Sequence, residues 1–173
     1  MQLTFTLSTQ ARYSFASRHC VTRPLVVLLI CCFKHELYQI IKARESVFVV
    51  EQHCPYQETD ELDLHAWHLS ALVNGELAAY ARVVDPGIKN NQPSIGRVMT
   101  LKKYRGLGIG RVLMEEAINF TMQKYPGKDI KVSAQVYLQH FYISLGFHAY
   151  GGPYDEDGIA HIEMVKPVSI ETQ

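Results

Sequence analysis

The sequence predicts a mixed α/β fold, in which helices cover a sheet of mixed strand direction. Segments with β-type patterning outnumber segments with helical periodicity, and strand pairs of the hairpin type occur toward both ends of the chain. The 173 residues are 47% apolar and 20% charged, which is typical of a folded globular chain rather than a disordered one. The length favours one domain over two.

The first 33 residues differ from the rest and form an atypical N-terminal segment. Residues 1–24 show no sustained period, and an apolar run follows at 25–33. This run is too short to span a bilayer, which takes about 20 residues as a helix. It could be a buried first strand, a targeting segment, or part of a poorly ordered or wrongly assigned start. We place the folded domain at residues 34–167, followed by a tail at 168–173, and expect no catalytic group before residue 34.

The domain begins with a predicted helix and an acidic stretch. Apolar residues recur near the helical period over 35–49, namely Leu37, Ile40, Ile41 and Phe48. Residues 51–64 are irregular and rich in carboxylates. Such a run is typical of a solvated loop, and the alternative interpretation is a mouth that attracts a cation.

A hairpin follows the acidic stretch. The β-rich segments 66–73 and 76–84 are separated by Asn74-Gly75, the strongest short-range signal for a two-residue hairpin turn. Beyond it we expect, in chain order, a loop at 86–94, a strand at 95–101, a helix from Gly110 to Pro126, a strand at 130–136, a short helix at 137–145 and strands at 147–150 and 159–165. The longer helix has one apolar face, and Gly146 suits the left-handed position after the shorter one.

Charge and cysteine content exclude several classes of function. Lys plus Arg and Asp plus Glu each number 17, so the chain lacks the basic balance of a nucleic-acid-binding domain. Four cysteines without a CxxC pair indicate neither a disulfide scaffold nor a structural zinc site. His65 and His68 lie three apart at the start of a strand and should face different ways, so we expect no metal site there. We therefore expect a soluble, cytoplasmic domain without metal, nucleic acid or membrane as a partner.

The most informative segment is Arg105-Gly106-Leu107-Gly108-Ile109-Gly110, between a strand and a helix. Glycines at alternate positions let backbone N–H groups converge, and the helix start adds positive potential, so the segment suits a pyrophosphate. A tight turn without a ligand is the alternative. A nucleoside-triphosphate loop would need Gly-Lys-Ser/Thr, and a dinucleotide fold would need GxGxxG early in a parallel unit. Neither pattern fits.

Arg-x-x-Gly-x-Gly after a strand resembles the acetyl-CoA-binding signature of the GNAT acetyltransferases. A second match, residues 135–147, resembles the family's helix that ends Phe-Tyr-x-x-x-Gly-Phe. Five further segments resemble the ElaA-like subfamily, namely 37–38, 47–52, 54–57, 95–98 and 156–162. The resemblance covers about residues 34–166. It implies a mostly antiparallel sheet flanked by helices and splayed between strands 95–101 and 130–136, with pantetheine in the opening.

The resemblance also assigns residues to the binding of acetyl-CoA as co-substrate. The backbone of Val98, Met99 and Thr100 would pair with the pantetheine amides as an added strand. Residues Arg105, Gly106, Leu107, Gly108, Ile109 and Gly110 would hold the pyrophosphate. Gln135 stands where many members have Asn, and its pantetheine contact departs from that commoner pattern.

The implied reaction is direct attack of a primary amine on the thioester of acetyl-CoA through a tetrahedral intermediate. Tyr142 matches the position of the general acid, and a backbone N–H of the splayed strand near Val98 could stabilise the oxyanion. Glu51 is the first candidate for the base because its apolar neighbours could raise its pKa, followed by His161 and by a water chain. Cys54 is rejected as a nucleophile because acidic neighbours would raise its pKa.

The acceptor amine stays open, as does a possible homodimer. The alternative function is a non-catalytic acyl-CoA sensor or interaction module on the same fold.

Overall fold

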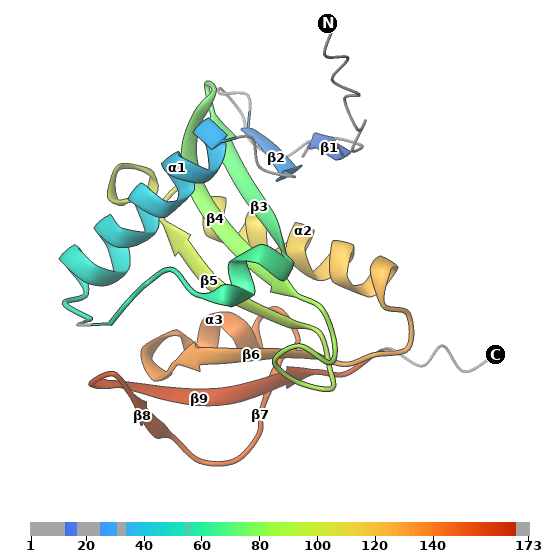
Figure 1. Cartoon of the computed structure of the whole chain (residues 1–173). Coiled ribbons are helices and arrows are strands. Elements are labelled where there is room, and N and C mark those ends of the chain that lie inside the picture. Colours follow the sequence, from blue (N-terminus) through green and yellow to red (C-terminus); the bar gives the residue numbers. More distant parts are fainter. Residues whose placement is uncertain (1–12, 17–24, 31–33, 55, 169–173) are drawn as a thin grey trace, which may run out of the picture.

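The strands of the described part of the chain form one nine-stranded sheet (Figure 1). The computed structural model describes residues 13–16, 25–30, 34–54 and 56–168. The strands are β1 (Tyr13–Ala16), β2 (Leu25–Ile30), β3 (Ala66–Val73), β4 (Glu76–Val84), β5 (Ser94–Thr100), β6 (Ile130–Gln135), β7 (His148–Ala149), β8 (Tyr154–Glu156) and β9 (Ile159–Lys166). Their order is β1-β2-β3-β4-β5-β6-β9-β7, with β8 paired to β9. Only the β5–β6 pair is parallel among the described strands.

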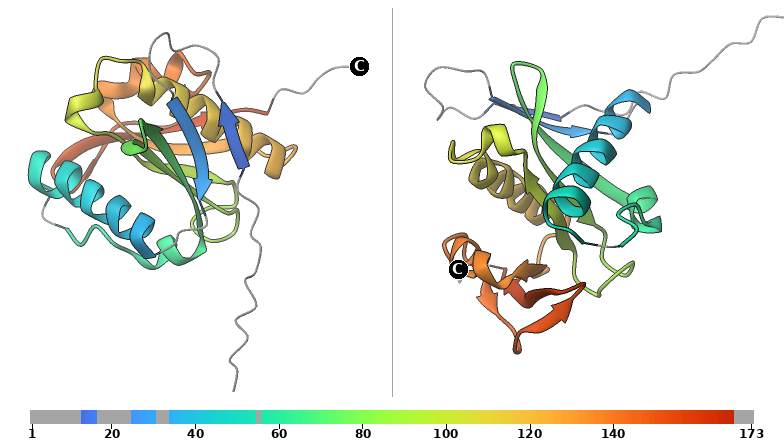
Figure 2. Two further views of the ribbon diagram at one scale, coloured as in Figure 1. Left: turned by 90° about the horizontal axis from the view of Figure 1, so that it is seen from above. Right: turned by 90° about the vertical axis from the view of Figure 1, so that its left-hand side faces the viewer.

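Helices cover both faces of the β3–β5 part of the sheet (Figure 2). Helix α1 (Lys34–Arg44) lies on one face and α2 (Ile109–Lys124) on the other, while the short α3 (Gln139–Ile143) lies beside β6. Successive residues of a strand point to opposite faces. Accordingly, Ala79 and Ala81 of β4 pack in the apolar cluster that contains α2, and Tyr80 packs in the cluster that contains α1. The mixed α/β fold predicted from the sequence is confirmed.

Several elements match their predicted positions. The turn Asn74-Gly75 has φ values of +53° and +81°, the left-handed values that a two-residue hairpin of this type requires. Gly146 has φ +87° in the turn that follows the short helix, three residues beyond Ile143. The apolar run at 25–30 is a strand, paired antiparallel with β3, so the strand interpretation is confirmed over those residues. The rest of the N-terminal segment and residues 169–173 lie outside the described residues.

Three differences from the expected elements stand out. The predicted first helix continues past Arg44, but Glu45–Glu51 is wound as a π-helix. Strand β8 was not expected, and it forms a hairpin with β9 through a turn at Asp157, which has φ +56°. The short helix predicted at 137–145 is divided into a 3₁₀ turn, Val136–Leu138, and α3.

The two interpretations of the acidic stretch are both wrong for three of its carboxylates. Glu58 is 4% exposed and, like Asp60 and Asp63, forms ion pairs with arginines. Part of the stretch, Glu61–His65, is a 3₁₀ helix rather than irregular loop. These three carboxylates are therefore neither solvated nor free to attract a cation, whereas Glu51 and Glu61 of the same stretch are exposed.

Candidate active site

The sheet opens between β5 and β6, and the opening is a cavity of about 880 Å³. Only Ser94 and Ile95 of β5 pair with β6, opposite Lys131 and Val132. Beyond that point the two strands diverge, and both line the cavity (Figure 1). The splayed pair predicted at this place in the chain is thus present in the structure.

A bulge in β5 turns part of its backbone away from β4. Tyr80 pairs with Met99 and Arg82 pairs with Gly96, so Arg97 and Val98 together oppose the single residue Ala81. In such a bulge one residue is left outside the ladder, and the strand bends. The edge of β5 that faces the cavity is therefore free of β6 from Gly96 onward, where an extended ligand could pair with it.

The glycine-rich segment begins next to this edge and leads into α2. Gly106 and Gly108 have φ values of +76° and +75°, which side chains rarely adopt, and Gly108 is the N-cap of α2. A Cβ on Gly110 would lie 3.1 Å from the Thr100 Oγ1. The segment is exposed on its outer side, with Leu107 57% exposed, whereas Ile109 is buried in the core. The first N–H groups of a helix have no partner within it, so this turn suits an anion.

Glu51 and Arg105 form an ion pair across the mouth of the cavity. The two guanidinium NH groups of Arg105 bind the two carboxylate oxygens of Glu51, one of them at 3.0 Å, and the Arg105 Nε donates to the Thr100 carbonyl at 2.9 Å. The bond to Arg105 lowers the pKa of Glu51. The expectation that apolar neighbours raise this pKa is wrong, because the carboxylate is exposed and meets a guanidinium.

Tyr142 lies on α3 with its ring buried between those of Phe141 and Phe147. Burial raises the pKa of its phenol to about 12, higher than the near-ordinary value expected from the sequence. The phenol therefore stays protonated throughout the physiological range. Gln135, at the end of β6, donates to the Gln52 Oε1 at 3.1 Å and lines the same cavity.

His161 lies on β9, opposite Gln135 of β6 and Tyr154 of β8. Its Nδ1 is 2.8 Å from the Ile159 carbonyl oxygen. A carbonyl only accepts, so Nδ1 carries the proton and the Nε2 of the neutral ring is left as an acceptor. His161 lines the cavity and is half-buried. It is therefore not a core histidine.

A polar wall faces β5 across the cavity, and sequence reasoning missed most of it. The Ser133 hydroxyl lies 2.6 Å from the Tyr154 hydroxyl and donates to Glu156 at 3.1 Å. Lys131 donates to Glu163 at 3.1 Å. The alternation of polar and apolar residues along β6 was a usable signal for this wall, whereas the partners on β8 had none.

Two further residues assessed from the sequence lie near this region. Burial, with Asp157 and Glu58 nearby, raises the pKa of the Cys54 thiol, which confirms the expected direction. His68 bonds to the Tyr80 hydroxyl at 2.7 Å and the Asp63 carbonyl at 3.0 Å.

Within the described part of the chain, no three His, Cys, Asp or Glu side chains are grouped as metal ligands would be, and no helix is long and apolar enough to cross a membrane.

Comparison with known proteins places this geometry in context. Residues 36–168 match the family described as the acetyltransferase (GNAT) domain. ElaA of Escherichia coli is 39% identical over 135 residues, which cover 77% of this chain and 88% of that protein. A UPF0039 protein of Synechocystis is 42% identical over 130 residues, 75% of this chain and 84% of its own. The crystal structure of an acyl-CoA N-acyltransferase from Pseudomonas aeruginosa superposes with a TM-score of 0.77 at 39% identity, covering 84% of this chain and 99% of that one.

Proposed function

The chain belongs to the GNAT acetyltransferase family, and on that premise we propose that it transfers the acetyl group of acetyl-CoA to a primary amine. Members of this family are acyltransferases that use an acyl-CoA as co-substrate. The observation that carries the proposal is that the parallel β5–β6 pairing ends after Ile95 and that the lining of the opening beyond it includes Arg105 and Gly110 of the glycine-rich turn. An extended chain that ends in a diphosphate fits such a cleft.

The residues present suit acyl-CoA in two respects. The free edge of β5 at Val98, Met99 and Thr100 offers backbone groups to the pantetheine amides. The left-handed Gly106 and Gly108 let the turn present its N–H groups to the pyrophosphate. Among the backbone groups of β5, the Thr100 carbonyl already accepts a hydrogen bond from Arg105. That hydrogen bond would have to be shared or exchanged when the pantetheine binds.

Proton transfer is assigned to two side chains that line the opening, one on β9 and one on α3. An alkylamine has a pKa near 10 and must lose a proton before it attacks. We assign the removal of that proton to the Nε2 of His161, because its Nδ1 is held as a donor. The amine nitrogen then forms the N–C bond of the tetrahedral intermediate, and the phenol of Tyr142 protonates the thiolate as the C–S bond breaks. The nitrogen gives up its second proton, which returns to the Tyr142 phenolate through water. The support for this second role is that Tyr142 lines the opening, although burial makes its phenol a weaker acid than a free one.

Glu51 is assigned a different role from the one first expected. Its carboxylate is bound by Arg105, at the end of the cavity where the pyrophosphate would lie. A carboxylate with a lowered pKa is a weak base. We therefore propose that Glu51 holds the Arg105 guanidinium in an ion pair, which must open when the pyrophosphate binds. In this proposal Glu51 does not remove a proton from the amine.

The test is a thermal-shift titration with acetyl-CoA, with NADH and ATP as controls. A ligand at about 100 times its dissociation constant should stabilise the protein by about 2.7 kcal/mol, a shift of several degrees. Gly108→Glu should abolish this shift because it places a charged side chain at a φ of +75° in the turn. A folded wild-type chain with no shift would refute the proposal.

A second variant separates an enzyme from a sensor that only binds acyl-CoA. Tyr142→Phe should keep acetyl-CoA affinity and lose about 100-fold in turnover, measured by free-thiol detection across a screen of amines. Tyr125→Phe is the matched control, since Tyr125 bonds to Asp85 and does not line the cavity. Binding without turnover in the wild type would favour the sensor.

The cellular location and the oligomeric state are part of the same proposal. We propose a cytoplasmic enzyme, which fractionation of the tagged chain tests. Sedimentation of the purified chain tests the possible homodimer.

A further inference from the structure

One residue of the β5 bulge adopts a conformation that its side chain disfavours. Arg97 has φ +51°, the left-handed region, and with Val98 it opposes Ala81. Glycine is the residue preferred at the left-handed position of a bulge, because a Cβ there comes too close to the following carbonyl oxygen. Something outside the strand must therefore hold Arg97 in place.

The side chain of Arg97 is held at three points. Its Nε donates to the Glu58 Oε1 at 2.9 Å, and its NH2 group lies 3.5 Å from the Asp60 Oδ2. The guanidinium also lies over the Tyr56 ring, 5.6 Å from the centroid. Only 23% of the Arg97 side chain is exposed. These contacts can offset the backbone cost of the left-handed conformation.

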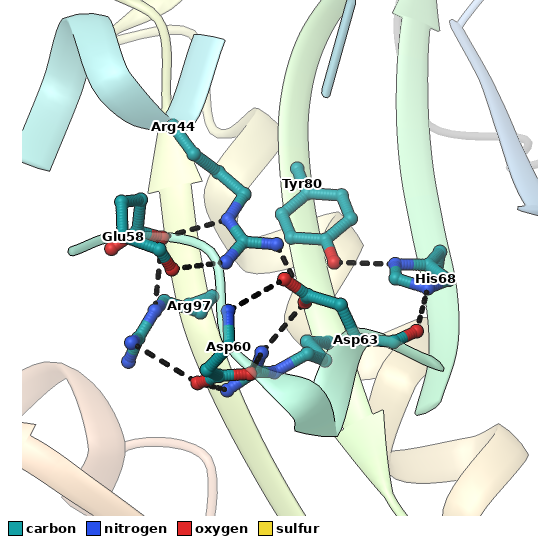
Figure 3. A network of polar contacts seen from close by, with 8 residues as sticks. Arg44, Glu58, Asp60, Asp63, His68, Tyr80 and Arg97 are labelled. Atoms are coloured by element: carbon teal, nitrogen blue, oxygen red, sulfur yellow. Dashed lines mark hydrogen bonds and ion pairs between the residues drawn. The ribbon is translucent and has the colours of Figure 1, made fainter. Parts of the chain in front are cut away.

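The two carboxylates are themselves anchored by arginines beneath α1 (Figure 3). Arg44, which is 0% exposed, donates to the Glu58 Oε1 at 2.7 Å and to the Asp63 Oδ1 at 2.7 Å. Arg82 donates to Asp60 at 2.6 and 3.0 Å. We call these six residues the arginine–carboxylate network: Arg44, Arg82, Arg97, Glu58, Asp60 and Asp63.

The arginine–carboxylate network is balanced and buried, which makes it rigid. It contains three guanidinium groups and three carboxylates, and its best-buried members are Arg44, Glu58 and Arg82. Removing one partner from such a buried set leaves an uncompensated charge, so alternative arrangements are costly. Its position is therefore fixed relative to both α1 and the bulge.

We infer that the arginine–carboxylate network positions the β5 bulge, and through it the backbone of Val98–Thr100 that faces acyl-CoA. Arg97 is the link, and Arg44 and Arg82 act as positioning residues; Arg44 does not line the cavity. This inference rests on the proposed function, since it supposes that acyl-CoA pairs with β5.

The physical reason is the two-residue period of a strand. If Arg97 relaxed to negative φ, β5 could pair with β4 without the bulge, and the residues beyond it would shift by one position. A shift of one residue turns every following side chain and backbone group to the other side. The backbone groups of Val98–Thr100 would then no longer point into the opening.

The test is a series at position 97: Arg97→Gly, Arg97→Asn and Arg97→Ala. All three remove the link to Glu58, but they differ in how readily the residue adopts positive φ. Acetyl-CoA affinity, measured by calorimetry, should fall least for glycine and further for asparagine. For alanine it should be about tenfold weaker than for glycine.

A second ligand separates positioning from general destabilisation. The nucleotide half of coenzyme A, 3′-phospho-ADP, does not reach β5 and should bind all three variants equally. The matched control is Asn74→Gly against Asn74→Ala, since Asn74 also has positive φ but does not line the cavity. That pair should change the unfolding temperature and leave acetyl-CoA affinity unchanged.

Glu58→Gln probes the network one step further from the strand. It keeps the size of the side chain and removes the charge that joins Arg44 to Arg97. If the variant folds, acetyl-CoA should bind more weakly and 3′-phospho-ADP should not. If it does not fold, the position-97 series decides alone.

The outcomes distinguish this inference from the proposed function. Equal acetyl-CoA affinity across the three position-97 variants, with a wild type that binds, would overturn the inference and leave the function standing. A wild type that binds no acetyl-CoA would overturn both.

Discussion

Replacing Glu51 with glutamine tests two roles for this residue. It is either the base that removes the proton of the amine or the partner that holds Arg105 in an ion pair. The Glu51 carboxylate binds the Arg105 guanidinium, which we propose meets the pyrophosphate, and the two side chains are 38% and 42% exposed. Glutamine keeps the shape and removes the charge. Two effects then act in the same direction: Arg105 is released, and a negative group is removed from the anion site.

The size of the effect follows from the exposure of the pair. Exposed ion pairs contribute about 0.2–1 kcal/mol, and the two-pronged geometry places this one toward the upper end. Glu51→Gln should therefore tighten acetyl-CoA binding about two- to fivefold. The gain should shrink as salt is raised, because the interaction is screened.

The assay is calorimetric titration with acetyl-CoA at low and at 0.5 M salt, together with kcat for an amine found by screening. The control is Glu76→Gln, which removes a more exposed ion pair, with Lys103, that does not line the cavity. Loss of about 100-fold or more in kcat at unchanged affinity would show that Glu51 is the base after all. Weaker acetyl-CoA binding would refute the proposal that the ion pair with Glu51 competes with the pyrophosphate for Arg105.

Three other predictions follow from the same structure. Gly110→Ala should weaken acetyl-CoA binding several-fold, because its Cβ would press on the Thr100 Oγ1, whereas Gly152→Ala, with open space around its Cβ, should not. His161→Gln should lower kcat about 100-fold with little change in acetyl-CoA affinity, and unchanged turnover would exclude His161 as the base. Burial lowers the pKa of His68 in the folded protein, so as the pH falls this histidine is protonated in the unfolded chain before it is protonated in the folded one. The free energy of unfolding should therefore fall as the pH drops below about 6.5, by up to about 1.4 kcal/mol per pH unit, until the folded protein also takes up the proton. Denaturant titrations at several pH values should show that the free energy of unfolding of His68→Gln depends less on pH.

The sequence predicted those elements whose cause is local. Asn74-Gly75 needs only its own backbone preferences to make a hairpin, and Gly146 needs only its own left-handed conformation. The helix from Ile109 to Lys124 has an apolar face and a proline two residues beyond its last residue. The position of the opening between β5 and β6 was predicted from the family resemblance and not from periodicity.

What the sequence did not predict depends on partners far along the chain. Glu58 lies 14 residues from Arg44 and 39 from Arg97, and no local pattern shows that both guanidinium groups meet its carboxylate. The acidic stretch therefore looked solvated. In the same way, Arg105 lies 54 residues from Glu51, so the apolar neighbours of Glu51 gave the wrong direction for its pKa.

The two missed ion-pair systems differ in burial, and this difference suggests different uses. The pair of Glu51 with Arg105 is exposed, so it can open at small cost when an anion arrives. The contacts of Arg44 with Glu58 are buried, so breaking them would leave a charge without water or partner. The Glu51–Arg105 pair can therefore exchange its partner for a bound anion. The Arg44–Glu58 pair should stay intact, and through Arg97 it holds the bulge of β5 in place.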